Sequence, residues 1–266
     1  MSIRIDKIYA GDYWSDGGAF MGVLPYSIWG NTTQIDERHR KSLSLNLVLI
    51  RTLERCILVD TGLGNRLNKK QIDIFKPSEF LLPQSLSELG IRDIDITDVI
   101  MTHLHFDHAG GIVTGFQDTD RLTFPNAEYW IQRSEWEVAK NPDGLNRAAY
   151  AFEHQLSLLE SDGKINLIEG DSEIYPGVRL TLSKGHSVGH QIIEIDSHDG
   201  FYIYAGDIIP TMFHALPAIT SAYDVCRKDT FKAKQYIYAK LKEKQGFLLL
   251  DHDNDKWAIP LADLRI

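Results

Sequence analysis

The sequence THLHFDHAGG, at residues 102–111, concentrates metal-binding side chains in one short segment. His103, His105, Asp107 and His108 fall within six consecutive positions. Imidazole and carboxylate groups are common ligands of transition-metal ions, and a packed core has little reason to collect them at this density. The alternate residues His103 and His105 can point toward one ion, while Asp107 and His108 reach a second ion about 3.5 Å from the first. The spacing therefore predicts a metal site that feeds two ions from one loop.

The residues around this motif predict how it is held. Residues 98–101 form a short apolar run with β-branched members, which is typical of a buried strand that delivers the loop at its carboxyl end. Gly110 and Gly111 carry no Cβ, so the chain can turn closely past its neighbours after the motif. A lone histidine is usually a surface or core residue satisfied by hydrogen bonds, but that explanation does not suit four ligands at one strand end.

Three later segments place further ligands where expected strands end. His186 lies between two expected strands, Asp207 follows a strand at 201–205, and His252 follows a strand at 246–250. A side chain at the end of a strand is held by a rigid element, which suits a preorganised site. Asp60 also follows a buried run, at residues 56–59, where a carboxylate needs a partner. It can accept the free ring N–H of a metal-bound histidine, although a plain turn-forming aspartate is the alternative.

Strand-like and helical patterns along the rest of the chain indicate the fold class. Strands are expected at residues 3–9, 43–51, 56–59, 98–101, 165–168, 178–182, 191–195, 201–205 and 246–250. Helices are expected at residues 82–89, 133–140, 145–160 and 228–244. Too many strands are adjacent without an intervening helix for a doubly wound parallel sheet, so two packed sheets flanked by helices are favoured. We find no internal repeat or linker and expect one domain over residues 1–266.

Composition and charge disfavour several classes of protein. Hydrophobic residues make up 43% and charged residues 24% of the 266 residues, which are ordinary globular values. The net charge of −9 argues against nucleic acid as the main partner. The N-terminus lacks the apolar core of a signal peptide, and no run approaches the roughly 18 apolar residues of a membrane-spanning helix. We therefore expect a cytoplasmic protein that does not contact a membrane.

Taken together, the metal-binding residues resemble those of the metallo-β-lactamase superfamily of metal-dependent hydrolases, over nearly the whole chain. By this resemblance one ion takes His103, His105 and His186, the other takes Asp107, His108 and His252, and Asp207 bridges both. The resemblance also implies an α/β (α+β) fold. This is the four-layer αβ/βα sandwich, two mixed β-sheets flanked by helices, with the site at one edge of the two sheets.

Two loops are similar to segments of the quorum-quenching N-acyl-homoserine lactonases, and methyl parathion hydrolase is similar in the same regions. These loops cover residues 16–25 and 206–211. Some of these lactonases carry a tyrosine three residues after the bridging aspartate, where this chain has Pro210. The oxyanion role of that tyrosine therefore has no counterpart at this position, and Tyr223 or His214 is a candidate substitute.

The dinuclear pattern implies hydrolysis by a hydroxide that bridges two divalent ions. Two ions that share a water lower its pKa toward about 7, so a nucleophile forms at neutral pH. Asp107 is the expected proton shuttle, because it reaches the same space while holding an ion, and Asp207 keeps the ions at their working separation. Zinc is the default ion for imidazole and carboxylate ligands, and manganese, iron or cobalt fit the same set.

Three functions compete on the sequence alone. The first is opening of an N-acyl-homoserine lactone or a related lactone ring, with the acyl chain held by a loop that carries Phe20, Met21, Tyr26 and Trp29. The second is hydrolysis of phosphotriesters or other esters, which needs the same two ions. The third is a metal-binding protein without activity, although a structural zinc site would close its coordination shell with four ligands. A homodimer would suit the aromatic loops.

Overall fold

Two six-stranded sheets form the centre of the computed structural model, which describes residues 3–31, 34–115, 119–150 and 156–264. The first sheet has the strand order β1-β2-β3-β4-β7-β8. Its strands are β1 Arg4–Asp16, β2 Arg40–Arg51, β3 Cys56–Val59, β4 Asp98–Ile100, β7 Glu128–Gln132 and β8 Ile165–Ile168. β1, β2 and β3 pair antiparallel, whereas β3, β4, β7 and β8 pair parallel, so the sheet is mixed.

The second sheet has the strand order β14-β13-β12-β11-β10-β9. Its strands are β9 Ser172–Tyr175, β10 Val178–Leu182, β11 Gln191–Ser197, β12 Gly200–Tyr204, β13 Phe247–Leu249 and β14 Ala258–Pro260. Only the pair β12 and β13 is parallel, so this sheet is also mixed. A small separate hairpin joins β5 Val113–Thr114 to β6 Arg121–Leu122.

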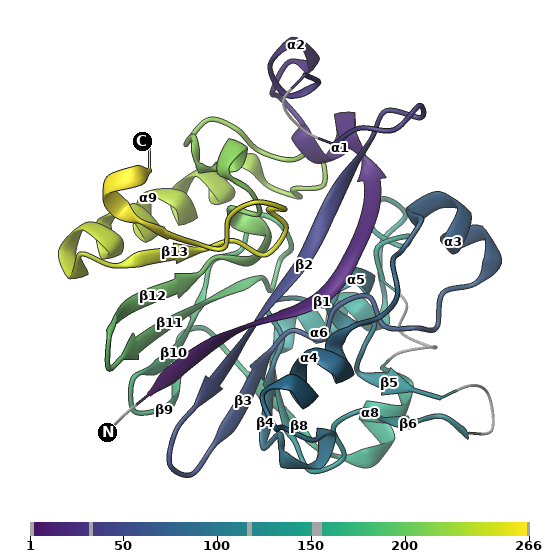
Figure 1. Ribbon diagram of the computed structural model, residues 1–266, viewed down its shortest axis with the longest axis vertical. Coiled ribbons are helices and arrows are strands. Elements are labelled where there is room, and N and C mark those ends of the chain that lie inside the picture. The colour runs from purple at the N-terminus through teal and green to yellow at the C-terminus, as the bar shows by residue number, and fades with distance from the viewer. Residues whose placement is uncertain (1–2, 32–33, 116–118, 151–155, 265–266) are drawn as a thin grey trace.

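Helices cover the outer faces of both sheets (Figure 1). The α-helices are α1 Gly17–Met21, α2 Tyr26–Trp29, α3 Lys69–Phe75, α4 Leu82–Glu88, α5 Phe106–Ala109, α6 Arg133–Lys140, α8 Ser157–Asp162 and α9 Arg227–Lys244. The short 3₁₀ helices are η1 Asp93–Asp95, η3 Gly206–Ile208, η4 Met212–Ala215 and η5 Leu261–Asp263. Within the described ranges, no helix combines the length and the apolar character needed to cross a membrane.

Side chains alternate between the two faces of each strand and so build three apolar layers. On β2, Val48 and Ile50 belong to a buried cluster shared with the second sheet, while Leu47 and Leu49 belong to a cluster shared with α4, α6 and α8. A third cluster joins the second sheet to α9 through residues such as Ile237. The order helix, sheet, sheet, helix confirms the predicted four-layer αβ/βα sandwich.

Two predicted segments differ from the structure. The expected helix over 145–160 is wrong in its first part: residues 144–149 form turns, residues 151–155 lie outside the described residues, and α8 begins at Ser157. The carboxylate of Asp143 accepts the N–H of Asn146, and the Ala149 carbonyl accepts the N–H of Phe106, so this backbone is committed to turns. The expected loop near the N-terminus instead contains α1 and α2, the former capped by Asp16.

Candidate metal centre

The residues predicted as ligands converge at one edge of the two sheets, where β4, β12 and β13 end. The THLHFDHAGG motif follows β4 and runs into α5; the later ligands lie in the β10–β11 turn, in η3 after β12 and in the loop after β13. After the motif, a Cβ on Gly110 or Gly111 would approach the carbonyl oxygen of Leu63 or Thr61 to 2.0 or 2.2 Å. The predicted close approach of the backbone is therefore confirmed.

His103, His105 and His186 form one side of the cluster, which we call the imidazole half. Their ring nitrogens and an oxygen of Asp207 lie within 4.8 Å of one another. His186 Nε2 lies 3.0 Å from His105 Nδ1 and 2.9 Å from Asp207 Oδ2. Three imidazoles are a ligand set typical of zinc and similar ions with an open coordination position.

Asp107, His108, Asp251 and His252 form the other side, which we call the carboxylate half. The two imidazoles and oxygens of Asp251 and Asp207 make a second group within 4.8 Å. His252 Nε2 lies 3.3 Å from His108 Nε2 and 3.6 Å from Asp107 Oδ2. This half therefore offers more oxygen ligands than the imidazole half.

Asp207 lies between the two halves. Its Oδ2 faces His186 at 2.9 Å, and its Oδ1 lies 3.2 Å from His252 Nε2 and 3.5 Å from His108 Nε2. One carboxylate oxygen is thus directed to each half, which is the geometry that a bridging ligand requires.

Asp60 follows β3 and orients ligands of both halves from behind. Its Oδ2 accepts from His108 Nδ1 at 2.9 Å and from Thr102 Oγ1 at 2.8 Å, and its Oδ1 accepts from Thr102 N at 2.7 Å. Thr102 Oγ1 in turn lies 3.1 Å from His103 Nδ1. Asp60 adopts a left-handed backbone, φ 59°, to reach these partners. With Nδ1 engaged, the Nε2 atoms of His108 and His103 face the centre, as the sequence analysis expects of an Asp60 partner.

Two further imidazoles are oriented by partners that the sequence analysis missed. His186 Nδ1 donates to Asp224 Oδ1, and His252 Nδ1 donates to the Ser44 carbonyl, each at 2.9 Å. Asp224 precedes α9 in an irregular segment, where no periodicity or strand end marks a carboxylate as special. A backbone carbonyl such as that of Ser44 carries no sequence signal at all.

The two halves differ in how their imidazoles hold protons. Burial and neighbouring imidazoles lower the pKa of His103 well below its usual range and that of His105 to about 3. Burial also acts on the other imidazoles, but adjacent carboxylates outweigh it. They raise the pKa of His108 well above its usual range, that of His252 to about 9 and that of His186 to about 10. Within the imidazole half, His186 is therefore the exception.

Buried polar atoms without partners test whether the cluster fits a metal. His103 Nε2, Asp207 Oδ1 and both carboxylate oxygens of Asp251 have no hydrogen-bond partner within the described part of the chain. Buried polar atoms are normally paired, and buried carboxylates are retained where they pair or coordinate a cation. The orphaned atoms lie in both halves, so the donor set fits a divalent cation in each.

Asp251 is a cluster residue that sequence reasoning missed. It immediately precedes His252, is 1% exposed, and follows the buried residues of β13. Burial and the nearby carboxylate of Asp207 raise the pKa of the Asp251 carboxyl. The same signal that singled out Asp60, an acid directly after a buried strand, could have found it.

Glu135, also missed, joins the two loops that carry the imidazole half. It is fully buried on α6 and accepts through Oε1 from Leu104 N and Tyr150 Oη, both at 3.0 Å. Its Oε2 accepts from Ser187 Oγ at 2.6 Å and from Gly189 N at 3.1 Å. One carboxylate therefore fixes the segment around His103 and His105 against the segment around His186.

A pocket of about 600 Å³ opens onto the cluster. Its polar lining includes the candidate ligands His105, Asp107, His186 and Asp207. Its apolar lining includes Phe20, Phe75, Phe106, Leu145, Ala149 and Val225. This volume, with a few convergent polar groups beside an apolar chamber, is typical of a small-molecule site.

Two tyrosines bring hydroxyl groups to this pocket. Tyr13, on β1, donates from Oη to Asp107 Oδ2 at 2.5 Å, and nothing in the sequence marks it. Tyr223, which the sequence analysis names, also lines the pocket, with its Oη 3.2 Å from Ser15 Oγ. Tyr13 is therefore committed to a candidate ligand, whereas the partner of Tyr223 is a serine hydroxyl outside the ligand cluster.

Four predicted pocket residues lie elsewhere. Met21 and Trp29 are 0% and 3% exposed and pack in the core, because helix α1 turns only Phe20 toward the pocket. Tyr26 is 50% exposed on α2 and stacks edge-on against Trp29. His214 is buried, and its Nε2 faces the Phe20 carbonyl at 3.1 Å. The structure does not bring these four residues to the pocket lining. For Met21, Tyr26 and Trp29 the reason is that the glycine-rich segment folds into helices rather than an open loop.

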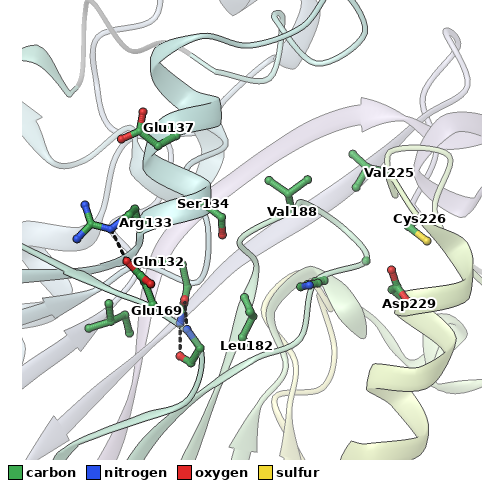
Figure 2. A pocket seen from close by; sticks show the side chains of 14 residues that line it. Gln132, Arg133, Ser134, Glu137, Glu169, Leu182, Val188, Val225, Cys226 and Asp229 are labelled. Atoms are coloured by element: carbon green, nitrogen blue, oxygen red, sulfur yellow. Dashed lines mark hydrogen bonds and ion pairs between the residues drawn. The ribbon is translucent and has the colours of Figure 1, made fainter.

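A second cavity, of about 630 Å³, lies behind the turn that carries His186 (Figure 2). Figure 2 shows Arg133 paired with Glu169, 2.7 Å apart, and Gln132 exchanging two hydrogen bonds with the backbone of Gly170. None of the residues that line this cavity belongs to the ligand cluster. Glu137, Lys184, Cys226 and Asp229 also line this cavity, which is separate from the metal centre.

Comparison with known proteins adds independent findings. Residues 43–265 match the family model described as the metallo-beta-lactamase superfamily. The N-acyl homoserine lactonase AiiA of Bacillus thuringiensis subsp. kurstaki is 34% identical over 160 residues, 56% of this chain and 57% of that protein. The match thus spans less than two thirds of this curated relative.

Solved structures extend the likeness over nearly the whole chain. A probable metal-dependent hydrolase from Staphylococcus aureus is 31% identical, with a TM-score of 0.89, and the match covers 97% of this chain and 91% of that one. An N-acyl homoserine lactone hydrolase with N-hexanoyl-L-homoserine bound at its catalytic metal centre is 24% identical, with a TM-score of 0.73, covering 96% and 95%. The second likeness concerns the fold alone.

Proposed function

Because the chain belongs to the metallo-beta-lactamase superfamily, we propose that it is a metal-dependent hydrolase that opens lactone rings, with N-acyl-homoserine lactones as the substrate class. The observation that carries this proposal is the Asp207 carboxylate, which directs one oxygen to each half of a buried ligand cluster beside an apolar pocket. The name of a relative that is 34% identical supports the choice of a lactone.

The proposed chemistry divides between the ions and the protein. When bound, a pair of divalent cations supplies a water of lowered pKa as nucleophile and positive charge beside the carbonyl oxygen. Asp107 Oδ2 is placed to take the proton of the attacking water and return it to the ring oxygen as the C–O bond breaks. Tyr13 holds that carboxylate in position by donating to the same oxygen. Asp207 keeps the two halves at a fixed separation.

The pocket residues orient the substrate in this proposal. Phe20, Phe75 and Phe106 present apolar surface for an acyl chain and exclude water from the cluster. Tyr223 Oη, which lies 3.2 Å from Ser15 Oγ, is the donor for a substrate carbonyl in this proposal, in place of the tyrosine absent at Pro210. Tyr223→Phe should then lower kcat/KM by about tenfold, the effect of one hydrogen bond. Unchanged turnover in that variant would remove Tyr223 from the proposal.

A direct substrate comparison tests the choice of a lactone. Protein reconstituted with zinc or manganese is assayed against N-acyl-homoserine lactones, simple lactones and an aryl phosphotriester, with Asp207→Ala as the inactive comparator. We expect kcat/KM for a lactone to exceed that for the phosphotriester, and both to vanish in the variant. A phosphotriester turned over faster than every lactone would overturn the substrate class. A reconstituted protein that turned over none of them would overturn the hydrolase proposal.

A further inference from the structure

Asp251 is the most isolated carboxylate in the cluster. It is 1% exposed, and neither of its oxygens has a hydrogen-bond partner within the described ranges. Its backbone carbonyl accepts from Asn46 N at 2.8 Å, so the residue is held in place although its side chain is not satisfied. Its recorded ion pair in the described chain is with His252, whose Nε2 lies 3.7 Å from Asp251 Oδ2.

The neighbours of Asp251 give its carboxylate a direction. One of its oxygens belongs to a group with ring nitrogens of His108 and His252 and an oxygen of Asp207, and these four atoms all lie within 4.8 Å of one another. Asp207 is itself a carboxylate, so two buried negative groups adjoin each other here. Such an arrangement is costly unless a cation or a shared proton compensates it.

Asp107, the other carboxylate of this half, is held differently. It accepts a hydrogen bond from Tyr13 Oη and lines the substrate pocket. Asp251 accepts none in the described chain and is not part of that lining. One carboxylate thus faces the space where a substrate would lie, and the other faces only the cluster.

We propose that Asp251 is a ligand of the cation in the carboxylate half, together with His108, Asp207 and His252. This rests on the metal centre proposed above, and it adds to that centre a ligand from outside the seven-residue set. The extra oxygen ligand makes this half suit a harder ion, such as manganese, better than the imidazole half does. It also helps to keep the ion bound when Asp107 takes up a proton.

Metal titration of Asp251→Asn tests this inference without an activity assay. Metal-free wild type and variant are titrated with Zn²⁺ and with Mn²⁺ against a chelator of known affinity, and the bound ions are counted by mass spectrometry. We expect the variant to keep one ion of wild-type affinity and to bind the second at least about tenfold more weakly, with the larger loss for Mn²⁺. Two ions at wild-type affinity in the variant would overturn the inference.

Asp253→Asn is the matched control from the same segment. The Asp253 carboxylate accepts backbone N–H groups of Met212, Asp255 and Lys256 and is not part of the cluster. This control should bind both ions like the wild type. If it loses the second ion as Asp251→Asn does, disturbance of the segment explains the loss, and the inference fails.

Thermal unfolding of the metal-free proteins separates a ligand from a protonated structural acid. If Asp251 is an unsatisfied carboxylate awaiting a cation, Asp251→Asn leaves the metal-free protein at least as stable as the wild type and reduces the rise in Tm on metal addition. A metal-free variant that melts well below the wild type, with a normal rise on metal addition, would contradict the inference. Should Asp251→Asn fail to fold, Asp251→Ser is put through the same titration.

These outcomes are distinct from those that test the function. A wild type that binds no divalent cation overturns the proposed metal centre itself. If the wild type turns over a lactone and the Asp251→Asn variant keeps both ions, only the proposed role of Asp251 is overturned.

Discussion

The imidazole half and the carboxylate half of the cluster lie side by side but are built on different principles. In the first, His103 and His105 have lowered pKa values and stand as neutral ligands at pH 7. In the second, His108 and His252 have raised pKa values because carboxylates surround them. His103 and His105 are thus ready for a cation, whereas His108 and His252, and also His186 in the imidazole half, hold protons until a cation replaces them. Two metal sites that share one bridging residue can therefore differ in how readily each binds its cation.

Removal of Asp207, the residue that the two halves share, should weaken metal binding in both halves. Asp207→Ala takes a ligand oxygen from each half, so both halves should lose metal affinity. Loss of a residue that only orients a ligand costs up to roughly 100-fold, and loss of the ligand itself should cost more. Turnover should fall with the metal affinity. Metal content after dialysis and kcat/KM measured on the same samples check this. Retention of two ions by this variant would contradict the bridging role.

Asp107→Asn should separate chemistry from metal binding within the carboxylate half. Loss of the proton acceptor should lower kcat by about 10²- to 10⁴-fold. KM and the affinity of the imidazole half should stay close to those of the wild type. Steady-state kinetics with a parallel metal count test this, and full kcat in the variant would remove the proton-transfer role.

Residues behind the ligands offer a way to weaken one half at a time. Asp224→Asn replaces the charged acceptor of His186 Nδ1 by a neutral amide and should weaken the imidazole half, by about 10- to 100-fold in metal affinity. Asp60→Asn makes the same change to the acceptor of His108 Nδ1 and should weaken mainly the carboxylate half by a similar factor. Competition titrations of both variants check whether the losses fall on different ions. Identical losses on both ions would argue against two distinct halves.

The smallest expected effect concerns pH and the metal-free fold. Since the folded pKa values of His186 and His252, about 10 and about 9, lie above the ordinary value, these imidazoles stabilise the fold fully only below about pH 6.5. That contribution is lost as the pH rises through 9 to 10. The Tm of metal-free protein should therefore fall over this window, and that of metal-loaded protein should fall less. Parallel melting curves from pH 6.5 to 9.5 test the difference.

Much of the fold could be predicted from local pattern. Residues 56–59, 133–140 and 165–168 form elements with the predicted bounds, because their apolar periodicity and flanking breakers agree. The helices between residues 16 and 29 could not be predicted, because a glycine-rich sequence is typical of a loop. The cap at Asp16 and the packing of Met21 and Trp29 against the core make this segment helical.

Site residues could be predicted where they lie together in the sequence or directly follow a strand. Residues whose role comes only from contacts made in the folded protein could not. The seven predicted ligands come together because strand ends meet at one edge, which sequence order already implies. Tyr13 acts on Asp107, 94 residues away, and Glu135 joins segments of the chain that are far apart in sequence, so no local pattern reveals them. The zinc preference, the homodimer, the cytoplasmic location and the single domain stay predictions.

The most direct test of a hydrolytic centre with two halves is a titration of metal-free protein with a divalent cation. Mass spectrometry counts the bound ions, and base consumption follows the ring opening of an N-acyl-homoserine lactone in the same samples. We expect little turnover with the first equivalent and full turnover as the second binds, with none in Asp207→Ala. Full turnover without metal, or at one bound ion, would contradict this expectation.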